Sequence, residues 1–416
     1  MASASSGEVR QRKSNKSTSQ CKKENLNSGY SPGTQARHHG DSATCSVFST
    51  PCILIGLLFT PVILLVLAPS PINPQYNKLS RPIALDGALA VNDLLTKAKR
   101  LLQNEVVAPE SLVTYGDYIF TGTGDGKVLR IHREKLIVTE LIPLGKKPCG
   151  KLEWEPTCGR PLGMRIHNDY LYVIDAYLGL FKYDLSSIDE PAINLISGMN
   201  FGNDLVISPE GTIYYTESSQ RWQRKDIYIF FLESTQDGRL MQYNETSGAS
   251  EVLLDSLSFP NGVELAPGGD FLVVCETSKA RIIRYWLRGP AHRSWDIFSD
   301  GLPILPDNIR RSPRFTFWVG ASAVRTDSKM EYLMEESPFI RSIVAKIVQL
   351  FGPGPMFQVL PKHGMILEFD LMGNIVRSLH DPTGKWVPSI SEVEEVDGYI
   401  YLGSYFLPFI SRLKLN

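Results

Sequence analysis

The amino-acid sequence predicts an all-β fold, a six-bladed β-propeller, and two observations lead to it. Units of apolar strands separated by tight turns recur about every 50 residues, a period typical of propeller blades. An oxygen-bearing side chain also stands at a constant distance before several of these strands. No single unit can bury both faces of its sheet, whereas a radial array of units can. A β-sandwich, the alternative, does not suit six equivalent copies.

Six copies of the unit align on their hydrophobic strands, and each has room for four short strands. Every copy reads as a turn, an apolar strand, a small or polar turn, and a strand that ends on an aromatic or basic residue. The propeller is therefore expected to occupy residues 106–416. The copies begin near residues 116, 168, 210, 269, 315 and 397.

The fifth copy is interrupted by residues 326–361, which include MEYLMEESPFIRSIVAKIVQLFG and read as helices rich in Met, Leu, Ile and Phe. We therefore expect a helical insertion in blade five. Three roles stay open for it: a lid over an apolar substrate site, a helix at a membrane surface, or a helix packed on the side of the propeller.

The chain before the propeller divides into three predicted segments. Residues 1–43 are rich in Ser, Lys, Arg, Gly and Gln, a composition typical of a disordered tail. Residues 44–68 contain CILIGLLFTPVILLVLA and no charged side chain, and about 20 apolar residues suffice to cross a bilayer. Residues 69–105 begin as a Pro-rich extended stalk and continue into VNDLLTKAKRLLQNEV, whose leucines recur at the spacing of an amphipathic helix.

The apolar segment is predicted to be a transmembrane signal-anchor of a single-pass, type II membrane protein. Basic residues cluster before it, which keeps the N-terminus in the cytosol. A cleaved signal peptide is the alternative, but the lead is long and no small-residue cleavage site follows. The propeller would then be extracellular or lumenal, at the plasma membrane or in the endoplasmic reticulum.

Cysteine usage and a glycosylation sequence agree with that location. Cys149 and Cys158 bracket a short polar loop that a disulfide could close in an oxidising compartment. Cys275 lies in an apolar strand and is expected to be a buried free thiol. Asn244 begins a glycosylation sequon in a turn between strands. The net charge of −1 argues against a nucleic-acid partner, which would require a basic face.

Polar side chains precede the strands in a fixed register. Asn203, Asn261 and Asp307 each stand ten residues before the strand position that repeats in their copies. The corresponding residues of the other copies are Glu110, Leu162 and Glu392. Equivalent positions form a ring around the channel, where unpaired carboxylates are costly to bury. Ca²⁺ with oxygen ligands removes that cost, and Zn²⁺ is disfavoured because the set has no His or Cys. The alternative is that these residues only cap turns.

The segment from about residue 105 to 416 resembles the strictosidine synthase-like family, which is related to paraoxonases and gluconolactonases. It carries, in order, CGRPLG, GNDL, YYTESSQRW, DGRLMQYN, FPNGVELA, LPDNIR and EVDGYIYLGS. The resemblance implies a six-bladed propeller, a disulfide between Cys149 and Cys158, and a channel Ca²⁺ like that of the hydrolase relatives. The implied metal positions are Glu110, Asn203, Asn261 and Asp307, with Asn308 as a further ligand.

Two hypotheses about function follow from the ring and the resemblance. The first is a membrane-anchored, Ca²⁺-dependent hydrolase of small aromatic or lipophilic esters, with arylesterase-like activity. Its general base would be Glu392, which stands where alkaloid-condensing relatives have a catalytic Glu. The second is a non-catalytic cell-surface propeller that binds protein partners, because the His pair near the paraoxonase metal has no counterpart here.

Overall fold

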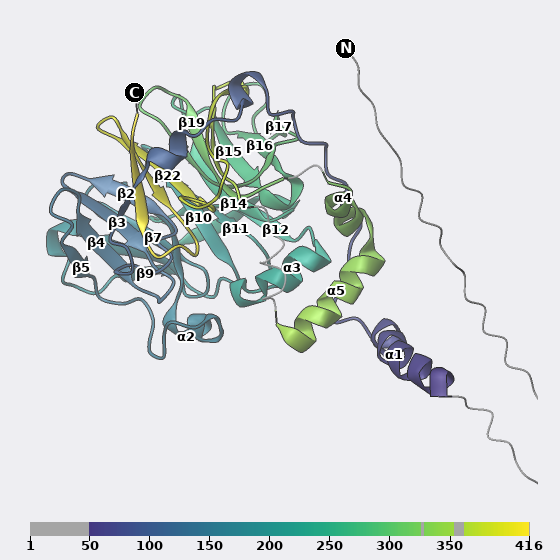
Figure 1. Cartoon of the computed structure of the whole chain (residues 1–416). Helices are drawn as coiled ribbons and strands as arrows, with labels where there is room; N and C mark the ends of the chain where they lie inside the picture. Colours follow the sequence, from purple (N-terminus) through teal and green to yellow (C-terminus); the bar gives the residue numbers. More distant parts are fainter. Residues whose placement is uncertain (1–49, 326–327, 353–361, 416) are drawn as a thin grey trace, which may run out of the picture. The chain divides into compact units, whose positions relative to one another are not determined.

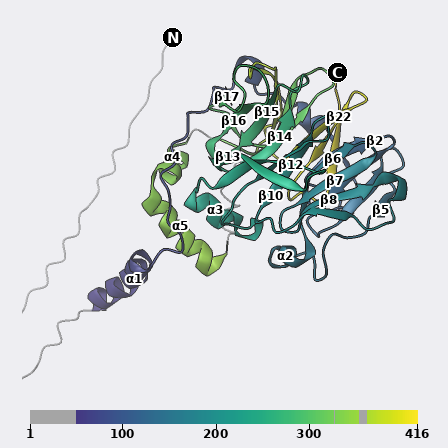
Figure 2. The same ribbon diagram turned by 180° about the vertical axis from the view of Figure 1, so that it is seen from behind.

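Six four-stranded antiparallel sheets build a closed β-propeller, which confirms the predicted fold (Figures 1 and 2). The computed structural model describes residues 50–325, 328–352 and 362–415. The innermost strands of successive blades contact one another in the order β2, β6, β10, β14, β18 and β22, and β22 returns to β2. The blades therefore form a complete ring around a central channel.

The strands of each blade follow one another along the chain, except in blade six. Blade one holds β2 (Leu112–Tyr115), β3 (Tyr118–Gly122), β4 (Val128–His132) and β5 (Val138–Glu140). Blade two holds β6 (Pro161–His167), β7 (Tyr170–Asp175), β8 (Gly179–Asp184) and β9 (Ile193–Ile196). Blade three holds β10 (Gly202–Ile207), β11 (Ile213–Glu217), β12 (Gly238–Asn244) and β13 (Ala249–Leu257). Blade four holds β14 (Pro260–Leu265), β15 (Phe271–Glu276), β16 (Arg281–Trp286) and β17 (Trp295–Ser299). Blade five holds β18 (Ile304–Arg311), β19 (Phe317–Val324), β20 (Gly364–Phe369) and β21 (Ile375–Asp381).

Blade six is completed by a strand from the N-terminal side of the propeller. Its first three strands are β22 (Glu392–Val396), β23 (Tyr399–Gly403) and β24 (Ile410–Lys414). The outermost strand is β1 (Lys99–Leu101), which pairs antiparallel with β24. The ring is therefore closed by hydrogen bonds between segments more than 300 residues apart in the sequence.

Each pair of neighbouring blades shares an apolar core. Side chains alternate along a strand, so each sheet has two apolar faces, and the adjoining blades cover both. Six clusters of buried side chains, one at each interface, result among the described residues. The cluster between blades four and five includes Phe271, Ile304 and Phe317 together with Cys275, which is a buried free thiol as predicted.

Residues 70–98, which we call the strap, lie along the propeller rather than apart from it. The Gln75 N–H donates to the Glu233 carbonyl at 2.8 Å beside blade three, and the Ile83 N–H donates to the Gly301 carbonyl at 2.8 Å after blade four. The Asn92 side chain donates to the Ser378 carbonyl at 3.0 Å in blade five. The predicted stalk is therefore extended, but it is bound to the propeller along its length.

The prediction of an amphipathic helix within residues 91–106 is wrong. The strap forms only two 3₁₀ turns, η1 (Gly87–Leu89) and η2 (Leu94–Lys97), before β1 begins at Lys99. Leu95 is completely buried against blades five and six, with Leu94 half-buried beside it, and Leu102 is buried between blades six and one. Pairing with β24 requires an extended backbone, so tertiary structure overrides the local helical pattern.

The remaining helices lie in loops between strands. The disulfide between Cys149 and Cys158, with a Cα–Cα distance of 5.3 Å, closes the loop after blade one and confirms the predicted bridge. That loop contains η3 (Leu152–Trp154) and α2 (Glu155–Cys158). The other 3₁₀ turns are η4 (Leu185–Ser187), η5 (Arg224–Asp226) and η6 (Thr277–Lys279). Blade three carries α3 (Ile227–Glu233), and the predicted insertion of blade five forms α4 (Lys329–Glu336) and α5 (Pro338–Phe351).

Helix α1 (Thr50–Leu67) falls in the predicted signal-anchor, residues 44–68. Within the part of the chain that the structure describes, no helix combines the length and apolarity that a bilayer crossing requires. The predicted tail, residues 1–43, and residues 44–49 lie outside the described residues. Residues 60–416 belong to one compact unit, and the contacts given below lie within it.

Candidate metal centre in the propeller channel

Bulges in the innermost strands hold most of the predicted ligands. In β10, β14 and β18 the strand pairing is interrupted, and the unpaired positions include Asn203, Asn261 and Asp307. A bulge redirects a side chain from the normal alternation of a strand. Glu110 lies just before β2, where its N–H donates to the Gly122 carbonyl at 3.2 Å. All four residues are buried in the channel, with at most 5% of their surface exposed.

Contacts across the channel bring these residues together from distant parts of the chain. The Asn308 side-chain nitrogen donates to Glu110 Oε1 at 3.0 Å. Burial raises the pKa of Glu110. Burial, and then the nearby carboxylate of Glu110, raise the pKa of Asp307 well above its ordinary value. The two carboxylates that the sequence places in the ring therefore repel each other in a buried site.

Four oxygen atoms of this set have no hydrogen-bond partner among the described residues. Each asparagine is held through its nitrogen: Asn203 donates to Ser218 Oγ at 2.8 Å, Asn261 donates to Thr277 Oγ1 at 3.2 Å, and Asn308 donates to Glu110. The buried oxygens left without a partner are Glu110 Oε2, Asn203 Oδ1, Asn261 Oδ1 and Asn308 Oδ1. A buried acceptor without a partner costs about 1–3 kcal/mol, so this group of atoms fits a bound cation.

The donor set suits a hard cation. In the described part of the chain no three His, Cys, Asp or Glu side chains gather as metal ligands. The set instead combines the carboxylates of Glu110 and Asp307 with the amides of Asn203, Asn261 and Asn308. Such neutral and charged oxygen ligands together are characteristic of Ca²⁺ sites.

Two hydroxyl groups position the asparagines and link neighbouring blades. Ser218 Oγ also donates to the Pro260 carbonyl at 2.9 Å, and Thr277 Oγ1 donates to the Pro306 carbonyl at 2.7 Å. Each hydroxyl thus fixes the ligand of its own blade and the backbone beside the ligand of the next blade. Sequence reasoning missed both residues, although the related stretches TESS and CETS carry them at the same place in their repeats.

A buried ion-pair layer lies next to the ring, further along the innermost strands. Arg310 pairs with Asp204 Oδ2 and with Glu392 Oε2, at 2.6 Å in each case. Ser111 Oγ donates to Glu392 Oε2 at 2.9 Å. All four residues are buried, and the sequence analysis had identified only Glu392 among them.

The predicted place of Glu392 in the ring is wrong by one residue. Ser391 occupies that place, because its Oγ donates to the Glu110 carbonyl at 2.5 Å and its own carbonyl accepts the Asn308 N–H at 3.0 Å. Strand β22 has no bulge, which explains the shift in register. Arg310 and Ser111 bond one oxygen of Glu392, and the Val393 N–H donates to the other. These contacts suit a structural role better than the predicted role of general base.

Aromatic side chains, which we call the aromatic roof, lie beside the channel at the end where the innermost strands begin. The roof consists of Tyr177, Phe201, Phe230 and Phe259, which pack in one buried cluster. Phe201 and Phe259 each precede a ring asparagine by two residues, and α3 contributes Phe230, whose ring lies 5.1 Å from that of Phe259. The roof therefore borders this end of the channel, next to the buried charged residues Glu155 and Arg160.

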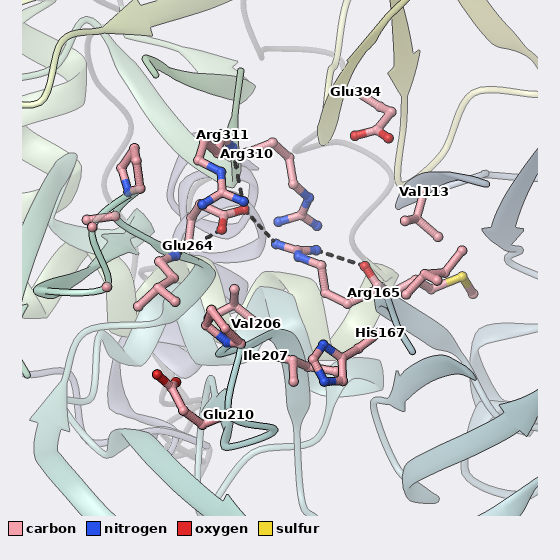
Figure 3. A pocket seen from close by; sticks show the side chains of 18 of the residues that line it. Val113, Arg165, His167, Val206, Ile207, Glu210, Glu264, Arg310, Arg311 and Glu394 are labelled. Atoms are coloured by element: carbon pink, nitrogen blue, oxygen red, sulfur yellow. Dashed lines mark hydrogen bonds and ion pairs between the residues drawn. The ribbon is translucent and has the colours of Figure 1, made fainter. Parts of the chain in front are cut away.

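The opposite end of the channel opens into a pocket of about 430 Å³ (Figure 3). Arg165, Glu264 and Arg310 lie at its centre, and Figure 3 shows the interaction between Arg165 and Glu264, whose nearest atoms are 3.3 Å apart. Arg311, Glu394 and His167 lie around them. The pocket lies on the other side of the ion-pair layer from the ring, so it does not reach the candidate ligands directly.

The predicted glycosylation residue lies on the surface, far from the channel in the strand order. Asn244 is exposed at the end of β12, and its Oδ1 accepts the Ser247 N–H at 3.0 Å within a turn. An exposed turn is accessible to a glycosylating enzyme. Glycosylation of Asn244 stays a prediction.

Comparisons with known proteins agree with the propeller fold. The solved structure of a gluconolactonase from Xanthomonas campestris superposes with a TM-score of 0.53 at 15% identity, over 84% of this chain and 99% of that chain. Regucalcin from Agrobacterium tumefaciens, a calcium-binding protein, superposes with a TM-score of 0.50 at 11% identity, over 76% of this chain and 93% of that chain. At these identities the likeness extends to the fold alone.

Relatives found by sequence have much higher identity to this chain. The family model of strictosidine synthase matches residues 203–290, and that of the strictosidine synthase-like N-terminal region matches residues 87–131. The adipocyte plasma membrane-associated protein of Gallus gallus is 41% identical over 93% of this chain and 94% of its own length. The protein of that name from Homo sapiens is 39% identical over 91% of this chain and 92% of its own length. The chain therefore belongs to the adipocyte plasma membrane-associated protein family of strictosidine synthase-like propellers.

Proposed function

We propose that the chain is a Ca²⁺-dependent hydrolase of small aromatic or lipophilic esters. The observation that carries the proposal is the group of four buried oxygens without partners in the channel. The names of two structural neighbours, a gluconolactonase and a calcium-binding protein, support it further. The aromatic roof beside the ring supports an apolar substrate, because it offers the flat apolar surfaces that such esters contact.

The ligands would be Glu110, Asn203, Asn261, Asp307 and Asn308. A Ca²⁺ ion bound there would supply a Lewis acid that polarises an ester carbonyl. Ser218 and Thr277 hold the amide oxygens in place, so little rearrangement would accompany binding. The aromatic roof would exclude water and orient the aromatic or alkyl part of the ester.

Phenyl acetate hydrolysis by the purified full chain in detergent tests this function. We expect turnover that a chelator abolishes and added Ca²⁺ restores, and a loss of about tenfold or more in Glu110→Gln. The exposed carboxylate of Glu210, which pairs with Arg288 at the open pocket, gives the control variant Glu210→Gln. Turnover that is indifferent to both the chelator and Glu110→Gln would contradict the proposal.

A second function, a non-catalytic cell-surface propeller that binds protein partners, is favoured by the burial of the candidate ligands. The candidate ligands are almost completely buried, and a purely structural cation would need no access for substrate. The two functions differ in one result. A chain that Ca²⁺ stabilises, but that hydrolyses no aryl or alkyl ester, would be the binding protein.

We also propose that the chain is a single-pass, type II membrane protein with an extracellular or lumenal propeller. The charge-free sequence from Ser42 to Asn77 and the name of the relatives, plasma membrane-associated, support this. The disulfide fits the oxidising compartment that the topology requires. In cells, we expect a glycosidase-sensitive shift on electrophoresis that Asn244→Gln removes. An unglycosylated protein with reduced Cys149 and Cys158 would contradict the topology.

A further inference from the structure

Helix α5 differs from an ordinary surface helix on both its buried and its outer side. Its buried side combines the apolar residues Ala345 and Val348 with two cationic residues, Arg341 and Lys346. Its outer side carries Phe339, Leu350 and Phe351, which are 63%, 66% and 74% exposed. A helix on the surface of a water-soluble protein normally places its apolar stripe inward and its charges outward. The outer side of α5 therefore suits an apolar environment.

The two inward cations connect the insertion to the chain that precedes the propeller. The Lys346 ammonium group donates to the carbonyls of Leu65 and Val66, both at 3.0 Å. These carbonyls belong to the last turn of α1, whose acceptors lack partners within the helix. Arg341 donates to the Leu232 carbonyl at 3.2 Å and also to the Gln75 carbonyl in the strap.

The end of α1, which Lys346 holds beside α5, is also apolar and exposed. Val62, Ile63, Leu64 and Leu67 are all exposed there. No Asp, Glu, Lys or Arg occurs between Ser42 and Asn77, so α1 itself carries no charged side chain. Helices α3, α4 and α5 lie together beside the blades in both views of the structure (Figures 1 and 2).

We propose that the outer side of α5, with the end of α1, contacts the acyl chains of a lipid bilayer. A protein partner would be expected to meet a polar rim with several hydrogen-bonding groups, whereas among the exposed residues of α5 only Gln349 carries such groups. Acyl chains require only apolar contact. Tyr76, which is exposed in the strap next to the Gln75 contact of Arg341, would lie at the level of the headgroups, where tyrosine is enriched. The inference concerns how the propeller lies on the membrane and is independent of ester hydrolysis.

Depth-dependent quenching of fluorescence tests this contact in the full chain. An environment-sensitive fluorescent amino acid replaces Phe339 or Phe351 in protein reconstituted into phosphatidylcholine vesicles that contain doxyl-labelled lipid. The matched control is Phe315, which is also 63% exposed but lies in the turn before β19, whereas the insertion follows the far end of that strand. The two ends are about 23 Å apart.

We expect blue-shifted emission at positions 339 and 351, and quenching by shallow doxyl groups about twofold or more stronger than at position 315. Emission at 339 and 351 that matches position 315 would overturn the proposal. So would a blue shift without lipid quenching, which would mean that a second copy or another protein covers α5. Failure of the protein to remain with the vesicles would overturn it as well.

Discussion

Three asparagine side chains in the channel are held by their nitrogen atoms, which leaves their oxygens without partners in the described structure. A ligand that binds only the folded state stabilises it by mass action, by about 2.7 kcal/mol at a concentration 100 times its Kd. We expect Ca²⁺ to raise the Tm of the wild-type chain in a saturable way. Asn261→Leu should lose this increase, as followed by thermal unfolding with and without a chelator.

The control for that measurement is Asn194→Leu, because Asn194 is an exposed amide in β9 outside the channel. It should keep the Ca²⁺-dependent increase in Tm. An equal increase in Asn261→Leu would show that this amide is no ligand.

Asp175, like Glu110 and Asp307, carries a carboxylate whose charge is costly to bury. Its Oδ1 accepts the N–H groups of Tyr177 and Leu178, both at 2.9 Å, while its Oδ2 has no hydrogen-bond partner among the described residues. Burial raises the pKa of Asp175 from 3.8 to about 6. A carboxyl whose pKa is higher in the folded state favours folding when protonated, and this contribution is lost as the pH rises from about 4 through 6.

Asp175→Asn keeps the acceptor at Oδ1 and removes the charge. We therefore expect the free energy of unfolding at pH 7.5 to rise by up to about 3 kcal/mol relative to wild type. At pH 4 the two proteins should be nearly equally stable. Urea denaturation at both pH values measures this, and a variant that is less stable at pH 7.5 would contradict the assignment.

The sequence predicted those residues of the channel that recur at the same position in several blades. Asn203, Asn261 and Asp307 have the same spacing because each lies in a bulge at the same place in its own blade. Blade six lacks the bulge, so its register differs, and Glu392 was predicted at the place that Ser391 occupies. The pairing of Arg310 with Asp204 could not be foreseen, since nothing in the local pattern links residues 106 positions apart.

At the scale of elements, the sequence predicted which side chains of the strap are buried, but not the conformation of its backbone. The leucines of residues 91–106 are buried or half-buried in the core, as an amphipathic pattern suggests, yet the chain there forms η2 and β1. Periodicity reports which side chains face the core, whereas the partner strand decides the conformation. Strand β24 is too distant in the sequence for the pattern to include it.

The strap should therefore contribute to stability like a part of the core. Leu95 is completely buried between blades five and six. We expect Leu95→Ala to lower the free energy of unfolding by about 2–5 kcal/mol. Val91, which is exposed in the same strap, provides the control Val91→Ala with a change of about 0.5 kcal/mol or less. Equal effects of the two substitutions in urea denaturation would mean that the strap packs only loosely.

At the scale of the whole molecule, stability depends on how the ring is closed. Arg100 in β1 lies directly opposite Ser411 in β24, and directly opposed residues of antiparallel strands are close enough for a disulfide. We expect oxidised Arg100→Cys/Ser411→Cys to be more stable than wild type by about 3–5 kcal/mol, because the crosslink restricts a very long loop in the unfolded chain. Urea denaturation of the oxidised variant measures the gain.

The oxidised variant is compared with the same variant after reduction. Reduction also breaks the native disulfide between Cys149 and Cys158, so wild type treated with the same reductant is the control. If the oxidised and reduced variants unfold at the same urea concentration, opening of blade six is not part of the unfolding transition.

The shared blade has a consequence for how the chain is made. A ribosome synthesises β1 more than 300 residues before β24, the strand with which it pairs. During that interval five blades can assemble, while β1 and the strap remain without the partner that closes the circle. Pairings between segments so distant in the sequence form slowly, because the intervening chain must first be ordered. Completion of the propeller is therefore a late event in biogenesis, and the nascent protein exposes an open edge until it occurs.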